Sequence, residues 1–144
     1  ELKALLTELP LAAVQLHGNE SQQYIDQLAC WLEQNHHQIE IWKAMAVKET
    51  FPAKLPRVDR LVLDTRGDNG QSGGTGQTFN WQILNQLKLE HPPVMLAGGL
   101  SPENLNEAKQ YPVVGFDLNS GVESQPGVKS EQKIQQAFAQ IFKA

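Results

Sequence analysis

The feature that most constrains this chain is a short apolar run that recurs five times. Each run has the length of one strand and is continuously apolar, which is typical of strands buried on both faces of a parallel sheet. Helical or irregular segments separate the runs, so a β-α unit repeats along the chain and predicts an α/β fold. The expected strands are residues 11–16, 39–47, 60–64, 94–97 and 113–118.

Capping residues and apolar periodicity predict the helices between the strands. Ser21, Asn80, Ser101 and Ser130 are of types favoured at helix N-caps, and each stands just before a candidate helix. The first three helices are expected to end near residues 34, 87 and 110. The side chains expected on buried helix faces are Tyr24, Ile25, Leu28, Ala29, Leu32, Trp81, Leu84, Leu87, Ile134, Ala137, Phe138 and Ile141.

Two architectures share a repeated β-α pattern: an open, doubly wound sheet and a closed (β/α)8 barrel, the TIM barrel. A single domain of 144 residues suits the open sheet, because a barrel usually needs about 200 residues or more. The barrel interpretation therefore requires an incomplete chain. Residues 1–6 resemble the tail of a helix whose strand is missing, which is one indication of that kind.

Composition argues against several classes of partner. The chain carries 12 Lys and Arg against 16 Asp and Glu without long runs of one sign, so neither nucleic acid nor a membrane surface is expected as a partner. The apolar runs are too short to span a bilayer, and the first residues lack the layout of a signal peptide, so a cytoplasmic location is expected. A single cysteine, Cys30, fits a reducing compartment, and the histidines do not stand at metal-ligand spacing from it, so no metal site is expected.

Two successive strands lead into loops suited to an anion. The run at residues 94–97 ends in a glycine pair, and Ser101 with Pro102 is expected to open a helix that presents its positive end to the ligand. The run at residues 113–118 leads into a small polar loop. Parallel strands end at one edge of a sheet, so the two loops predict one phosphate site. Its expected residues are Gly98, Gly99, Asn119, Ser120 and Gly121.

Asp64 and Asp117 each stand at the C-terminal end of an expected strand, the edge at which α/β proteins place their active sites. A lone aspartate in that position is often a helix cap or half of a salt bridge. Two carboxylates beside a phosphate site instead favour general acid-base chemistry on a sugar phosphate.

Other candidate residues are less specific. His17 follows a strand and can be a base or a hydrogen-bond donor to a substrate, although a capping role fits equally well. Lys43 lies within a strand and either neutralises the carboxylates or extends into solvent. Cys30 falls in mid-helix and is expected to be a packed thiol. The glycine-rich segment 65–78 fails the P-loop spacing, because Gln77 stands where the lysine belongs, and is expected to form a lid.

Six motifs, taken in order, resemble phosphoribosylanthranilate isomerase of tryptophan biosynthesis, and the resemblance runs over essentially all 144 residues. A further match at residues 123–129 resembles the isomerase half of the bacterial bifunctional enzyme that also carries indole-glycerol-phosphate synthase. The six motifs are Val14-Gln15-Leu16-His17-Gly18, Ile41-Trp42-Lys43-Ala44, Leu63-Asp64-Thr65, residues 73–81, Leu96-Ala97-Gly98-Gly99-Leu100 and residues 117–123.

The resemblance implies a (β/α)8 barrel, of which residues 1–144 would be a single partial domain with strands four to eight, strands one to three being absent. It implies an Amadori rearrangement of N-(5-phosphoribosyl)anthranilate to 1-(o-carboxyphenylamino)-1-deoxyribulose 5-phosphate, without a cofactor. Asp64 would be the general acid that protonates the ribose ring oxygen, and Asp117 would support ring opening. The substrate pocket would include Gln15, His17 and Lys43, and the two small loops would hold the phosphate.

One departure concerns the general base, which in the family is a cysteine in a Lys-Ile-Cys-Gly motif on the first strand. These 144 residues contain no such motif, and the arginine that meets the anthranilate carboxylate also belongs to the absent part. The chain alone is therefore expected to be inactive and the complete gene product active, with a synthase domain fused upstream as one expectation. The main alternative is a non-catalytic phosphate-binding α/β module derived from a sugar-phosphate barrel. A synthase of the same pathway and an NTPase fit less well.

Overall fold

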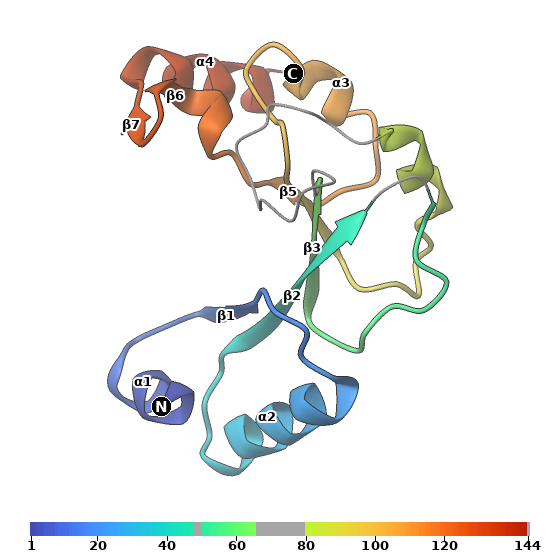
Figure 1. Ribbon diagram of the computed structural model, residues 1–144, viewed down its shortest axis with the longest axis vertical. Coiled ribbons are helices and arrows are strands. Elements are labelled where there is room, and N and C mark those ends of the chain that lie inside the picture. Colours follow the sequence, from blue (N-terminus) through green and yellow to red (C-terminus); the bar gives the residue numbers. More distant parts are fainter. Residues whose placement is uncertain (48–49, 66–79, 144) are drawn as a thin grey trace.

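The computed structural model describes residues 1–47, 50–65 and 80–143. Within these residues five strands form one parallel sheet, and their order in the sheet is their order in the chain (Figure 1). Every apolar run contains a strand, although the last strand is shorter than expected. The strands are β1 (Ala13–Leu16), β2 (Glu40–Val47), β3 (Arg60–Thr65), β4 (Val94–Leu96) and β5 (Gly115–Phe116).

The sheet is open, because β1 and β5 lie at its two edges and pair with no further strand among the described residues. The predicted α/β class and the parallel sheet are confirmed, whereas a closed barrel is not formed by this part of the chain. A separate two-stranded hairpin, β6 (Glu123–Gln125) and β7 (Val128–Lys129), was not expected. Its turn contains Gly127, whose φ of +79° suits glycine.

Alternating residues of the central strands face opposite sides of the sheet. Leu61, Leu63 and Leu96 share one face and are completely buried. The opposite face carries a smaller cluster of Ala44, Val62 and Ala97, with Trp42 and Met95 partly buried against it.

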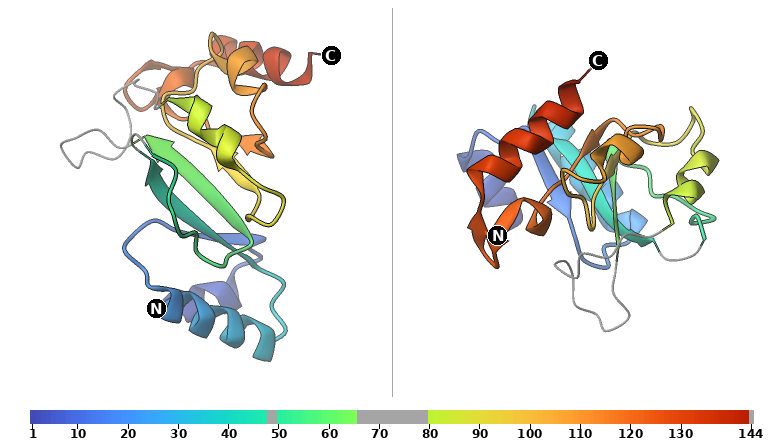
Figure 2. Two further views of the ribbon diagram at one scale, coloured as in Figure 1. Left: turned by 90° about the vertical axis from the view of Figure 1, so that its right-hand side faces the viewer. Right: turned by 90° about the horizontal axis from the view of Figure 1, so that it is seen from above.

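The helices lie in two groups at opposite ends of the sheet (Figure 2). α1 (Leu2–Glu8) and α2 (Gln22–Gln34) cover an apolar cluster next to β1 that includes Leu6, Ile25 and Leu28. The 3-10 helix η1 (Trp81–Gln86), α3 (Leu105–Ala108) and α4 (Glu131–Phe142) cover a second cluster around β3 and β4. No helix in the described part of the chain is long and apolar enough to cross a membrane.

Three of the four predicted N-caps are confirmed. Ser21 Oγ accepts a hydrogen bond from the Tyr24 N–H at 3.2 Å, and Ser130 Oγ accepts one from Lys133 N–H at 3.3 Å. Asn80 caps η1, which is a 3-10 helix and not the expected α-helix.

Three side chains expected to be buried are exposed. Tyr24 and Phe138 are 42% and 58% exposed, and Ala29 also faces solvent. Each lies at the edge of the apolar face of its helix, whereas the centre of that face packs against the sheet. Periodicity alone does not separate the edge of the face from its centre, so it predicts these residues to be buried. The expected lid, residues 65–78, falls outside the described residues apart from Thr65.

Candidate functional site

A pocket of about 380 Å³ opens where the parallel strands end. Asp64 stands at the end of β3, Asp117 follows β5, and His17 follows β1, so the common strand direction brings the three to one edge of the sheet. Asp64 is half-buried, whereas Asp117 and His17 are exposed. The pocket is lined by Gln15, His17, Asp64, Ala97, Gly98, Gly99, Leu100, Asp117, Leu118, Asn119, Ser120 and Lys129.

The turn after β4 consists of two glycines with left-handed backbone. Gly98 and Gly99 have φ values of 80° and 65°, which a residue with a Cβ rarely adopts. Asn104 fixes the turn: its Oδ1 accepts a hydrogen bond from the Ser101 N–H at 2.9 Å, and its Nδ2 donates to the Gly99 carbonyl at 2.9 Å. Bare backbone therefore lines this side of the pocket in a rigid conformation.

The helix expected to begin at Ser101 does not form there. Residues 101–104 make turns, and α3 begins only at Leu105 with Asn104 as the preceding residue. Instead of the i+4 bond of an α-helix, the Asn104 N–H donates to the Ser101 carbonyl at 3.1 Å, which closes a turn over residues 101–104. The predicted helix end at the phosphate site is therefore wrong, although the glycine pair lies where expected.

The loop after β5 forms the other wall. Asn119 and Ser120 line the pocket, and the 3-10 helix η2 (Ser120–Val122) follows at once. Gly121 lies behind the wall, where a Cβ would collide with the Leu100 carbonyl. The backbones of the two loops are therefore in direct contact at Gly121.

Lys43 does not line this pocket. Its register partners in the sheet are Leu16 and Leu61, which belong to the helix-covered face. The ammonium donates to the Gly18 carbonyl at 2.8 Å and pairs with the Glu20 carboxylate at 3.0 Å. Both roles predicted for Lys43 are therefore wrong, because its side chain is buried and meets a counter-charge on the far side of the sheet.

The Glu20–Lys43 pair holds the turn after β1. Both oxygens of Glu20 accept from the Gly18 N–H, at 3.0 and 3.1 Å, and Lys43 also donates to the Leu16 carbonyl at 3.4 Å. These contacts bracket His17, so a lysine predicted to touch substrate instead fixes the segment that carries another pocket residue.

Stability is expected to depend on the ionisation of Glu20. Burial raises the pKa of its carboxyl, but hydrogen bonds from its own backbone N–H, from Lys43 and from Gly18, with the charge of Lys43, lower it to a value below 4.5. A carboxyl whose pKa is lower in the folded than in the unfolded state stabilises the protein at pH values above its unfolded-state pKa. That stabilisation is lost as the pH falls through the folded-state pKa. We expect Glu20→Gln to cost stability near pH 7 and progressively less below about pH 4.5. Urea denaturation of both proteins from about pH 7 to about pH 3 measures this, and a cost independent of pH would contradict it.

Lys129, at the end of β7, is a pocket residue that the sequence prediction missed. Its Nζ donates to the Asn119 backbone oxygen at 2.8 Å and to the side-chain oxygen of the same residue, and it pairs with Glu123 at 2.9 Å. The signal that could have found it is the Pro-Gly turn, which folds residue 129 back beside the loop after β5.

Cys30 lies on α2 and is exposed, and its Sγ accepts a hydrogen bond from Gln34 Nε2 at 3.3 Å. It is not among the residues that line the pocket.

Among the described residues, no three His, Cys, Asp or Glu side chains gather in a way that could hold a metal ion.

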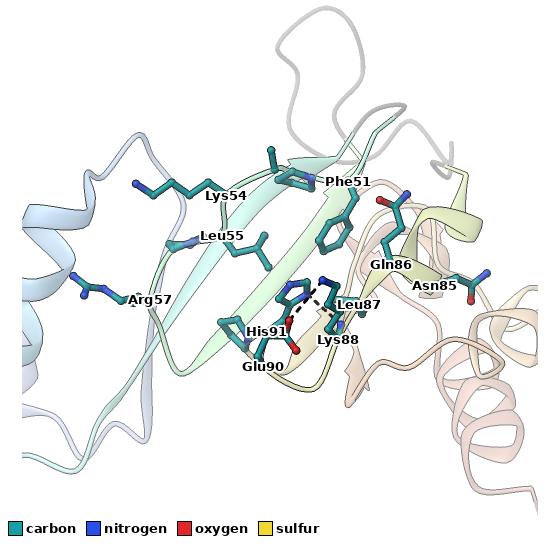
Figure 3. Close-up of a pocket in the computed structure, with 14 residues that line it drawn as sticks. Phe51, Lys54, Leu55, Arg57, Asn85, Gln86, Leu87, Lys88, Glu90 and His91 are labelled. Carbon is teal, nitrogen blue, oxygen red and sulfur yellow. Dashed lines mark hydrogen bonds and ion pairs between the residues drawn. The ribbon is translucent and has the colours of Figure 1, made fainter.

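A larger pocket, of about 900 Å³, lies between the β2–β3 connection and the η1–β4 connection (Figure 3). Phe51 stacks on His91 in it, with 5.7 Å between ring centroids. Its one carboxylate among the lining residues, Glu90, is paired with Lys88 at 3.7 Å. It contains none of the predicted site residues, so the pocket at the strand ends is the better candidate for catalysis.

Residues 1–140 match the family model described as N-(5'-phosphoribosyl)anthranilate (PRA) isomerase. "Tryptophan biosynthesis protein TrpCF" of Vibrio parahaemolyticus is 46% identical over 96% of this chain and 27% of its own length. The protein of the same name from Yersinia pestis is 48% identical over 91% of this chain and 26% of its own length.

Among solved structures, phosphoribosyl anthranilate isomerase from Thermus thermophilus superimposes with a TM-score of 0.77 and is 28% identical. The match covers 96% of this chain and 64% of that structure. The chain therefore spans about a quarter of the two curated relatives and less than two thirds of this structure.

Proposed function

The chain belongs to the N-(5'-phosphoribosyl)anthranilate isomerase family, and from this premise we propose that its complete gene product is an isomerase of tryptophan biosynthesis. The reaction is the Amadori rearrangement of N-(5'-phosphoribosyl)anthranilate to 1-(o-carboxyphenylamino)-1-deoxyribulose 5-phosphate. The observation that carries the proposal is the pocket at the strand ends. There a half-buried carboxylate, Asp64, shares one small cavity with the Gly98-Gly99 turn and the Asn119-Ser120 loop.

Asp64 is the general acid in this proposal. Opening the ribose ring requires a proton on the ring oxygen, and a carboxyl group at the mouth of a polar pocket can deliver it. Asp117, on the exposed side of the same pocket, supports ring opening, and Gln15 and His17 contact the rest of the sugar or its aromatic substituent.

The phosphate lies against Gly98, Gly99, Asn119 and Ser120 in this proposal. A glycine turn lets a ligand approach backbone N–H groups closely, and such concave runs of backbone bind anions. Gly121 contributes by bringing the two loops together.

Completion of the reaction requires a base that removes the proton from C2 of the opened sugar. The family resemblance assigns that role to a cysteine in a motif that residues 1–144 do not contain, and Cys30 lies outside the pocket lining. We therefore propose that the base and the arginine for the anthranilate carboxylate come from outside these residues.

We propose that residues 1–144 are one partial TIM-barrel domain, with β1 to β5 as strands four to eight. Both edges of the sheet are unpaired within the described residues, and the Thermus thermophilus structure is matched over only 64% of its length. A synthase domain fused upstream fits the two curated relatives, which are about four times longer than the matched segment.

The test compares the complete gene product with the isolated 144-residue chain, by following the loss of anthranilate fluorescence from the substrate. We expect turnover by the complete protein and a rate at least about 100-fold lower for the chain alone, since the base is missing. Phosphate binding without turnover by the complete protein would favour the non-catalytic module. Activity of the isolated chain at a normal rate would contradict the assignment of the base to another segment.

A further inference from the structure

Lys129 is the one Lys or Arg among the described residues that line the pocket at the strand ends. Among the described residues that line it, Asp64 and Asp117 carry formal negative charges, and Lys129 carries the one formal positive charge of a Lys or Arg. A phosphate monoester is close to a dianion at neutral pH. Without the ammonium, such a ligand would enter a pocket whose fixed side-chain charges are both negative.

The contacts of Lys129 also fix the conformation of the loop after β5. The ammonium donates to both oxygens of Asn119, one in the backbone and one in the side chain. A trans peptide is planar, so the Ser120 N–H points opposite to the Asn119 carbonyl. Holding that carbonyl on Lys129 therefore determines which way the Ser120 N–H points.

We propose that Lys129 is a positioning residue of the phosphate site: it orients the Asn119–Ser120 peptide and offsets the two carboxylates. The inference rests on the proposed function for the identity of the substrate, but not for the presence of a phosphate group. Glu123 weakens the attraction of Lys129 for an anion, because their ion pair at 2.9 Å partly neutralises the positive charge that faces the ligand.

The pair Lys129 and Lys133 offers a matched comparison. Lys133 Nζ donates to the Glu123 backbone carbonyl at 2.7 Å, so it contacts the same hairpin with the same charge, yet it does not line the pocket. Lys129→Gln and Lys133→Gln therefore remove equal charge from neighbouring positions, and only the first removes the contacts with Asn119.

The experiment titrates the complete gene product with inorganic phosphate in a calorimeter and measures kcat and KM for the phosphoribosyl substrate. We expect Lys129→Gln to weaken phosphate binding and raise KM by about 10- to 100-fold, the effect of losing a hydrogen bond to a charged group. The change in kcat should be smaller. Lys133→Gln should change the phosphate affinity and KM by less than about threefold each. Lys129→Arg should recover most of the phosphate binding lost in Lys129→Gln. Equal effects of the two glutamine variants would overturn the proposal.

A second variant, with the opposite expected effect on phosphate binding, keeps the test decisive if Lys129→Gln does not fold. Glu123→Gln removes the negative partner of Lys129 and retains an oxygen that can accept from the Gly127 N–H, as Glu123 does at 3.1 Å. Phosphate binding should become tighter, and weaker or unchanged binding would overturn the proposal. If the wild-type protein does not turn over the phosphoribosyl substrate, the proposed function fails, whereas the phosphate titration still decides the role of Lys129.

Discussion

Replacing Asp64 with asparagine is expected to lower kcat/KM of the complete gene product by about 100- to 10,000-fold, the usual contribution of general acid-base catalysis. Asparagine has nearly the same shape as aspartate but has no proton to give to the ribose ring oxygen. Asp64 is half-buried at the end of β3 and lines the pocket, so the substitution removes the carboxyl group at the place where the sugar is proposed to bind.

Two controls separate this loss from a loss of binding. Asp117→Asn changes the exposed carboxylate of the same pocket, and we expect a clearly smaller decrease in kcat/KM. Inorganic phosphate should bind Asp64→Asn at least as tightly as the wild type, because asparagine is neutral and adds no negative charge to the pocket. A variant with nearly normal turnover would show that Asp64 is not the acid.

Replacing Lys43 with methionine is expected to lower the free energy of unfolding by about 3 kcal/mol, at the low end for a broken buried ion pair. The side chain of Lys43 is 9% exposed and that of its partner Glu20 is 23% exposed, so the carboxylate left behind is only partly hydrated. The Gly18 carbonyl also loses its donor. Urea denaturation of the complete gene product measures the change.

The matched control is Arg57→Met, which breaks an ion pair of similar length at the surface. Arg57 and Asp26 are 2.8 Å apart, with side chains 79% and 48% exposed, so the expected cost is below about 1 kcal/mol. If the two variants lose equal stability, the Glu20–Lys43 pair contributes no more than a surface contact.

The positions of the strands, and the meeting of most candidate residues in one pocket, could be predicted from the sequence because both depend on local pattern. Apolar runs gave the strands, and the common direction of parallel strands places Asp64, Gly98 and Asn119 at one edge without any knowledge of long-range contacts. The capping serines likewise act on residues only three positions away.

The side of the sheet on which Lys43 lies could not be predicted in this way. Its neighbours Ile41, Trp42, Ala44 and Met45 are all apolar, so alternation does not show which face is covered by helices. Only the pairing with Leu16 and Leu61 decides it, and that information is absent from the segment itself.

The omission of Lys129 has a different cause. Its side chain bonds to the backbone of Asn119, ten residues away, and residue type alone does not indicate which partner a lysine will have.

The order of strands in the sheet has a consequence for how this part of the chain folds. Because each strand pairs with the next one along the chain, no pairing has to wait for a segment synthesised much later. β2 and β3 share the longest register, from Trp42–Arg60 to Val47–Thr65, and can pair first. β1 and β4 then add on its two sides in separate loop closures, in which Ala13 pairs with Glu40 and Leu61 pairs with Val94, so no single step closes most of the chain.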